Sequence, residues 1–364
     1  MCYNWNGEKN MKIKKKNLLI VTIILGLSSV GIFYYTTKDS NNGNSKKAAE
    51  KKASYSNESI KKIEKLNIKD KIDLNKYSKT LDTAIFSDDF VRDYVTYYEA
   101  VKYYDNKNLI KYINKLAKDG TAISEINEIF DKFIEYKNFD INNAKRYLSY
   151  SFKNASYKKQ DIVTRVNLSL DKPFYTDTKK VLKQDDIYAL VNKYNYVDVS
   201  YVPENLKPLF NISSLKMVAV AADAYQEFVE GAKKDGFSFI GTTAYRSAAW
   251  QKSLYDSYVN KDGVEKADTY SARPGYSEHQ LGYSVDLNEP SYKERRISPE
   301  GYEWIKNNAY KFGFILRYPE GKDNITGYQE ENWHIRYVGK DVAKKIYDLD
   351  ITFDEYYDLY IREY

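Results

Sequence analysis

The sequence predicts an α+β fold for residues 185–355. Three runs have the length and apolar content of strands, and they span residues 237–245, 282–287 and 333–338. The helices predicted between these runs do not alternate regularly with them, which argues against a doubly wound parallel sheet. A chain of 364 residues also has room for a second folded unit before this half.

The first helix of this half is predicted from an apolar face and its end signals. Ser213 or Ser214 is placed to cap the helix, because a serine side chain can accept a hydrogen bond from the first turn. Leu215 begins the apolar face, and Gly236 is a suitable residue just past the end. The strand at residues 237–245 follows directly.

Two further helices have recognisable caps. Ser247 is expected to cap the helix that follows the first strand. Its inward-facing residues are expected to be Trp250, Leu254 and Tyr258. Near the end of the chain, Thr352 and Glu355 have the spacing of a capping box.

The N-terminal region has the features of a membrane anchor. A mostly apolar run at residues 18–35 is close to the ~20 residues that cross a bilayer. It is preceded by Lys12, Lys14, Lys15 and Lys16, so residues 1–17 are predicted to be a basic cytoplasmic tail and the bulk of the chain extracellular. A cleaved signal peptide is the alternative, but no small-residue cleavage site lies at the right place. We therefore expect a single-pass protein of the cell membrane.

Between the predicted anchor and residue 185 the sequence shows no candidate catalytic or metal-binding residues. Residues 36–56 are rich in Ser, Asn, Lys and Ala and predict a flexible linker. Residues 57–170 have helical periodicity and predict a mostly helical spacer domain, with a possible strand at residues 165–170. Residues 356–364 are assigned as a C-terminal tail.

Charge and cysteine content narrow the classes of function. The net charge of +6 comes from 57 basic and 51 acidic residues, a balance that does not call for a nucleic-acid partner. The single cysteine, Cys2, excludes intramolecular disulfides and multi-cysteine metal sites. A metal site in this chain must therefore use nitrogen and oxygen ligands.

Both histidines of the chain lie in short segments that also carry carboxylates. His279 precedes Asp286 by seven residues, and Glu331 precedes His334 by three. Two imidazoles and one carboxylate can hold a catalytic zinc ion whose fourth position stays open for water. We therefore predict that His279, Asp286 and His334 bind zinc, and that Glu331 is the base that activates the zinc-bound water.

Three polar residues are candidates for binding the substrate. Arg246 follows the predicted strand at residues 237–245, where a side chain often faces a cleft. An arginine there suits either the free C-terminus of a peptide or a developing oxyanion, so it is both a binding and a catalytic candidate. Gln251 and Ser277 can each supply a neutral hydrogen bond, although Ser277 can equally serve as a cap.

Five motifs follow one another in residues 245–251 (YRS with Gln251), 274–286 (PGYSEHQLG through Asp286), 312–319 (FGFILRYP), 325–328 (ITGY) and 331–339 (ENWHIRYVG). Together they resemble the VanY-like D-alanyl-D-alanine carboxypeptidases. The resemblance covers about residues 185–355 and implies a zinc peptidase with an antiparallel sheet, of the Hedgehog/DD-peptidase type. It implies the same metal ligands, the same base and the same three substrate-binding residues. Asn332 departs from the family, which usually has proline there.

The resemblance implies that the substrate is the stem peptide of peptidoglycan. Release of the terminal D-alanine by a DD-carboxypeptidase is the first expectation. An LD-carboxypeptidase acting on tetrapeptide stems is an alternative that the motifs do not separate. A metal-stabilised wall-binding module without turnover is an alternative of another class, which an intact Glu331 argues against.

Overall fold

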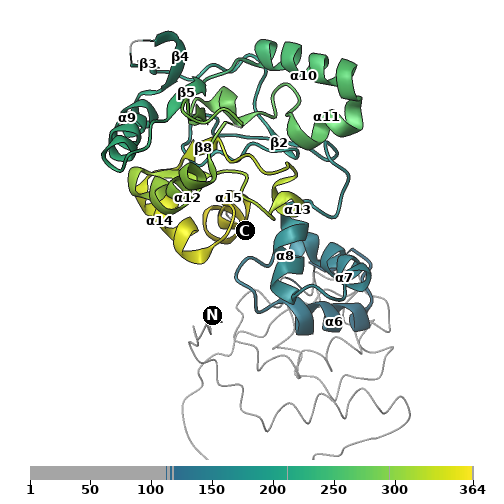
Figure 1. Ribbon diagram of the computed structural model, residues 1–364. Helices are drawn as coiled ribbons and strands as arrows, with labels where there is room; N and C mark the ends of the chain where they lie inside the picture. Colours follow the sequence, from purple (N-terminus) through teal and green to yellow (C-terminus); the bar gives the residue numbers. More distant parts are fainter. Residues whose placement is uncertain (1–111, 113–114, 117–118, 211, 295, 363–364) are drawn as a thin grey trace, which may run out of the picture. The chain divides into compact units, whose positions relative to one another are not determined.

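The computed structural model describes residues 112, 115–116, 119–210, 212–294 and 296–362 (Figure 1). The predicted cytoplasmic tail, anchor and linker, and the predicted spacer domain up to residue 111, lie outside the described residues. Within the described part of the chain, no helix combines the length and the apolar character that crossing a bilayer requires. The chain divides into two compact units, Met1–Asn127 and Glu128–Tyr364.

A four-stranded sheet lies at the centre of the second unit. Its strands are β5 (Ile240–Thr243), β6 (Ser284–Asn288), β7 (Phe314–Leu316) and β8 (His334–Tyr337), in the order β5-β6-β8-β7. Every neighbouring pair is antiparallel. The α+β class and the antiparallel sheet are therefore confirmed. The three predicted strands are present, each shorter than its apolar run.

The helices lie in two groups around this sheet. Figure 1 shows α9 (Ala219–Lys234), α12 (Pro299–Asn308) and α14 (Lys340–Leu349) together, away from α10 (Ala248–Asp262) and α11 (Val264–Tyr270). Phe228 of α9 packs its ring 5.5 Å from Trp304 of α12 and 5.9 Å from Phe314 of β7. These buried rings join the first group to the sheet. Truncating such a core ring to alanine costs about 3–5 kcal/mol of stability.

The helix predicted from Ser213 or Ser214 begins later than expected. Residues 206–218 form a hairpin of β3 (Leu206–Leu209) and β4 (Ile212–Val218), and α9 begins only at Ala219. In β4, Leu215 and Met217 are buried and Lys216 between them is only half-buried, which is the two-residue alternation of a strand. The prediction of a serine cap was wrong because this alternation was interpreted as a helical face. The end is as expected: α9 stops at Lys234, and Gly236 follows with φ +91°.

The described segment before β1 (Lys179–Lys180) is helical. It contains α6 (Ile123–Phe133), η2 (Ile141–Asn143), α7 (Ala144–Lys153) and α8 (Lys159–Asn167). The strand proposed at residues 165–170 was wrong, since α8 runs to Asn167 and buries Ile162, Val163 and Val166 at helical spacing. The short elements that follow are β1 (Lys179–Lys180), β2 (Asn195–Tyr196), η3 (Glu278–Leu281), η4 (Ala309–Phe312) and α13 (Asp323–Thr326).

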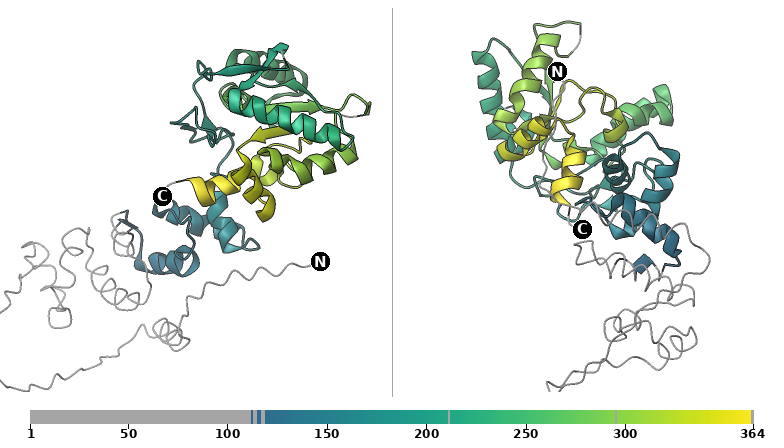
Figure 2. Two further views of the ribbon diagram at one scale, coloured as in Figure 1. Left: turned by 90° about the vertical axis from the view of Figure 1, so that its left-hand side faces the viewer. Right: turned by 90° about the horizontal axis from the view of Figure 1, so that it is seen from below.

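The last described elements of the chain are two short helices. The capping box of Thr352 and Glu355 is confirmed at the start of α15 (Phe353–Tyr356), and η5 (Tyr357–Ile361) continues it. In η5, the fully buried Asp358 accepts a hydrogen bond of 2.6 Å from Asn138 Nδ2. The views in Figure 2 show this yellow C-terminal helix beside the blue helical segment.

Candidate active site

The sheet and one tight turn bring the predicted metal ligands together. Asp286 of β6 lies directly opposite His334 of β8 in the antiparallel register. His279 lies in η3, the short helix that leads into β6. Gly282 ends η3 with φ +74°, a backbone conformation that glycine adopts without strain, and so turns the chain back toward the sheet. This turn places His279 beside Asp286 although seven residues separate them.

Nitrogen atoms of both imidazoles lie against one carboxylate oxygen. Asp286 Oδ1 is 3.3 Å from His279 Nε2 and 3.1 Å from His334 Nδ1. All three side chains are buried, and one ligand atom of each lies within 4.8 Å of the others. His279 Nδ1 donates to the carbonyl oxygen of Ala244 at 2.8 Å, which leaves Nε2 as an acceptor for a metal. The predicted ligand set is therefore assembled in the fold.

The three predicted ligands shift one another's pKa values. Burial opposes the charge of Asp286, but the imidazoles of His279 and His334 outweigh it and hold the pKa of this carboxyl well below its usual value. Burial lowers the pKa of His279, which favours the neutral imidazole that a metal requires, whereas at His334 burial is outweighed by the hydrogen bond and charge of Asp286, which raise the pKa. A compact set of two nitrogens and one carboxylate oxygen fits a divalent transition metal such as zinc.

Glu331 lies at the same site, on the loop that enters β8. Its Oε2 is 3.5 Å from His334 Nδ1. Burial raises the pKa of Glu331 to about 7, and the charge of Asp286 adds to this rise. A carboxyl group with such a pKa can both accept and release a proton near neutrality. Its neighbour Glu330 is exposed and does not line this pocket.

The three predicted substrate-binding residues line the same pocket. Arg246 Nη1 donates to Gln251 Oε1 at 2.7 Å, and Gln251 Nε2 donates to the carbonyl oxygen of Ala272 at 2.7 Å. Arg246 Nη2 lies 3.7 Å from Asp286 Oδ2, and burial lowers the pKa of the arginine. Gln251 therefore fixes the guanidinium beside the metal ligands. Ser277 is also buried in the pocket wall.

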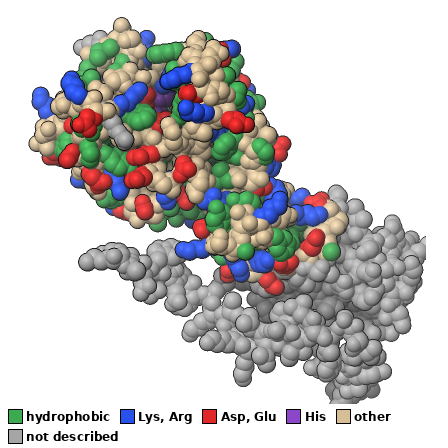
Figure 3. All heavy atoms as spheres, turned by 45° about the vertical axis from the view of Figure 1, so that its right-hand side comes forward, with side chains coloured by type: hydrophobic (Ala, Val, Ile, Leu, Met, Phe, Trp, Pro, Cys, Tyr) green, Lys and Arg blue, Asp and Glu red, His purple; other side chains and the backbone are tan. Residues whose placement is uncertain are grey.

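The pocket that contains these groups has a volume of about 390 Å³. Figure 3 shows a hollow on this face with a histidine side chain, in purple, inside it. Ser247 caps α10 as predicted, by accepting from the backbone N–H of Trp250. The inward side of α10 was predicted wrongly, however, because the residues that face the core are Ala248, Gln251 and Tyr255. The three predicted instead, Trp250, Leu254 and Tyr258, line the pocket.

A buried ionic network behind the metal ligands was not predicted. Glu278, directly before His279, accepts from Arg317 Nε at 3.0 Å and lies 3.5 Å from Arg336 Nη1. Arg317 also donates to Asp354 at 2.6 Å, and the four side chains are almost fully buried. The signal was present in residues 314–318 and 334–338, where an arginine interrupts each apolar strand. A buried arginine requires a carboxylate partner, so a buried acid was to be expected nearby.

Comparisons with known proteins agree with this geometry. The family model for VanY, D-alanyl-D-alanine carboxypeptidase, matches residues 214–340. "Putative carboxypeptidase YodJ" of Bacillus subtilis (strain 168) is 37% identical over 223 residues, which cover 57% of this chain and 81% of that protein. A D-alanyl-D-alanine carboxypeptidase of Enterococcus faecium is 33% identical over 240 residues, covering 63% of this chain and 71% of that protein.

Solved structures are also similar. The structure of the LdcB LD-carboxypeptidase is 37% identical, with a TM-score of 0.47, and the match covers 50% of this chain and 91% of that one. The two curated relatives are matched over most of their own length. The residues that the family model matches, 214–340, include the whole lining of the pocket. The chain therefore belongs to the VanY family of D-alanyl-D-alanine carboxypeptidases.

Proposed function

We propose that this protein is a zinc-dependent D,D-carboxypeptidase that releases the terminal D-alanine of peptidoglycan stem peptides. The observation that carries the proposal is the convergence of His279, Asp286 and His334 on one point, with Glu331 beside them. Among the described residues no other group of at least three histidine, cysteine or acidic side chains has this geometry. Family membership supplies the substrate class.

Each residue has a separate part in the reaction. Zinc held by the three ligands would lower the pKa of a water molecule to about 7 and polarise the scissile carbonyl. Glu331 accepts the proton of the attacking water and returns it to the amine of the departing D-alanine, a role that contributes roughly 10²–10⁴-fold. Arg246, held by Gln251, directs positive charge into the pocket. Ser277 offers a hydroxyl group to the peptide.

The decisive experiment compares the full chain with its Glu331→Ala variant. We expect both proteins to bind one zinc ion, measured by elemental analysis, and only the unchanged chain to release D-alanine from a pentapeptide stem. If the Glu331→Ala variant kept its activity, Glu331 would not be the base. Zinc binding without turnover in the unchanged chain would instead favour a wall-binding module.

The same assay separates the two carboxypeptidase specificities. The unchanged chain should release D-alanine from the pentapeptide and leave the tetrapeptide intact. Preferential cleavage of the tetrapeptide at its L,D bond would replace the proposal by an LD-carboxypeptidase with the same residues in the same roles.

We also propose that the enzyme is held at the outer face of the cell membrane by residues 18–35. The support is the apolar run and the four lysines that precede it. Deleting residues 1–35 should move the protein from the membrane fraction to the soluble fraction. External protease should digest the C-terminal half of the intact protein in whole cells stripped of their wall. Protection from the protease would contradict this orientation.

A further inference from the structure

A second arginine also approaches the predicted metal ligand Asp286. Arg296 lies in the segment between β6 and α12, and its Nη1 is 3.8 Å from Asp286 Oδ2. Arg246 Nη2 lies 3.7 Å from the same oxygen. Two guanidinium groups from distant parts of the chain therefore approach one carboxylate. Arg296 was not among the residues predicted from the sequence.

The two arginines are held in different ways. Arg246 is nine-tenths buried and donates to Gln251, so its position is fixed before any ligand arrives. The side chain of Arg296 is 46% exposed, and its guanidinium lies over the ring of Trp333, 5.0 Å from the ring centroid. Among the described residues, Arg296 has one ion-pair partner, Asp286. Its remaining donors are available to a ligand at the mouth of the pocket.

The surroundings of Arg296 are open enough for such a ligand. Arg296 and Trp333 line the main pocket, and both also line an adjoining pocket of about 340 Å³. The contact with the Trp333 ring restricts the guanidinium, and a guanidinium can bind a carboxylate through two parallel hydrogen bonds. Asp286 and Glu331 are the acidic groups that face the two arginines in this pocket. With a zinc ion bound, the ion and the two guanidiniums would carry more positive charge than these two carboxylates offset, and this surplus favours a negatively charged substrate.

A carboxypeptidase reaction presents two negative centres in this space. The free C-terminal carboxylate is charged throughout, whereas the oxyanion at the scissile carbonyl develops only in the transition state. A fixed donor in a buried site stabilises developing charge most effectively, because it needs no reorganisation. An exposed, partly hydrated arginine is better suited to the ground-state carboxylate, because binding there removes less water from the ion.

We propose that Arg296 is a specificity-determining residue that binds the free C-terminal carboxylate of the substrate, while Arg246 stabilises the oxyanion. This inference rests on the proposed carboxypeptidase function and assigns the two uses of an arginine to two different residues. Arg296 makes the enzyme select a chain end, and Arg246 accelerates the reaction at whatever carbonyl is in place. Trp333 acts as the platform that positions Arg296.

The kinetic test uses the zinc-loaded full chain and an acylated Lys-D-Ala-D-Ala peptide, either as the free acid or as the C-terminal amide. Arg296→Gln should raise KM for the acid about 10-fold, leave kcat within about 3-fold, and leave the amide unaffected. Arg246→Gln should lower kcat roughly 10²-fold or more for both peptides. Lys293→Gln, an exposed cation of the same segment that lines neither pocket, is the control and should change nothing.

A binding measurement keeps the inference testable without turnover. In the Glu331→Ala background, calorimetry should show that the acid binds about 10-fold more tightly than the amide, and that Arg296→Gln removes this difference. Loss of the difference through Arg246→Gln instead would overturn the assignment, as would an equal loss of kcat on both peptides in Arg296→Gln. If the unchanged chain released no D-alanine but still bound the acid more tightly than the amide, the proposed function would be contradicted. The assignment of Arg296 as the carboxylate-binding residue would still hold.

Discussion

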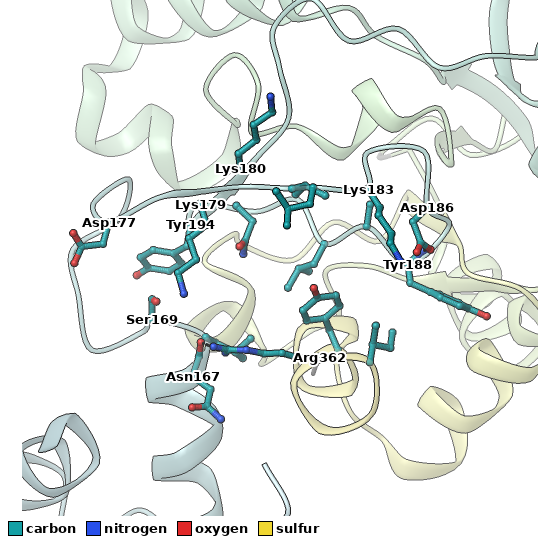
Figure 4. Close-up of a pocket in the computed structure, with 18 residues that line it drawn as sticks. Asn167, Ser169, Asp177, Lys179, Lys180, Lys183, Asp186, Tyr188, Tyr194 and Arg362 are labelled. Atoms are coloured by element: carbon teal, nitrogen blue, oxygen red, sulfur yellow. Dashed lines mark hydrogen bonds between the residues drawn. The ribbon is translucent and has the colours of Figure 1, made fainter. Parts of the chain in front are cut away.

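Two pockets of the Glu128–Tyr364 unit have similar volumes and very different chemistry. The active-site pocket has about 390 Å³, and a pocket formed by the end of α8, the segment around β1 and β2, and η5 has about 440 Å³ (Figure 4). The second pocket also has charged walls. Its charged residues are Asp177, Lys179, Lys180, Lys183, Asp186 and Arg362.

The charges of the two pockets are arranged differently. In the active site, two imidazoles and two guanidiniums approach the single carboxylate of Asp286, and all but one of these groups are buried. In the second pocket, Lys180 pairs with Asp198 at 2.7 Å and Arg362 lies 3.4 Å from Asp140. Figure 4 shows Lys180 extending away from Arg362. The candidate active site therefore differs from the second pocket in the convergence of its buried charged groups, and not in its volume.

The largest expected difference between the pockets is in metal binding. His334→Ala removes one of three ligands and should abolish stoichiometric zinc binding and D-alanine release. Lys179→Ala, in the wall of the second pocket, should leave both intact. Competition with a chromogenic chelator measures the zinc affinity of the two variants. Equal zinc binding by both variants would show that the ion lies elsewhere.

The next effect is on stability. Glu278→Gln removes the carboxylate that Arg317 and Arg336 share and leaves two buried guanidiniums short of a partner. The free energy of unfolding should fall by about 3–5 kcal/mol, as measured by urea denaturation. Asp177→Asn breaks an ion pair at the exposed rim of the second pocket and should not move the denaturation midpoint.

A smaller effect is expected at Gln251. Gln251→Leu removes the acceptor that holds Arg246, so kcat should fall by up to roughly 100-fold through misplacement of the guanidinium. Asn195→Leu makes the same amide-to-leucine change in the second pocket and should leave kcat unchanged. A Gln251 variant with normal kcat and normal KM would mean that Arg246 is positioned without it.

The smallest effect concerns Lys179 and pH. Lys179 is exposed, but partial desolvation at the pocket wall, together with the positive charge of Arg362, lowers its pKa below the usual value. The unfolded chain therefore binds more protons than the folded one just below the usual lysine pKa, and this residue makes stability rise with pH in that range. Lys179→Gln should flatten this rise slightly in thermal unfolding measured between pH 8 and about 10.5. If stability rose more steeply with pH in the variant, the pKa of Lys179 would be raised in the folded chain, not lowered.

The sequence predicted which residues meet in the pocket more completely than it predicted the bounds of the helices and strands. His279, Asp286, His334 and Glu331 were predicted because the chain has only two histidines and each is near a carboxylate. The serine cap before α9 was predicted wrongly because Leu215 fits a strand and a helix equally well, and only pairing with β3 decides between them. Arg296 and Glu278 were missed because their roles depend on contacts between segments distant in sequence.

The bond between Asp358 and Asn138 joins residues 220 positions apart, near the two ends of the Glu128–Tyr364 unit. Asp354, four residues earlier, completes the ion pairs of Arg317. During synthesis, residues 279–334 leave the ribosome before Asp354 and Asp358 do. The segment with the predicted metal ligands is therefore made before the acids that complete these buried contacts, and a chain that stopped before Asp354 would lack them.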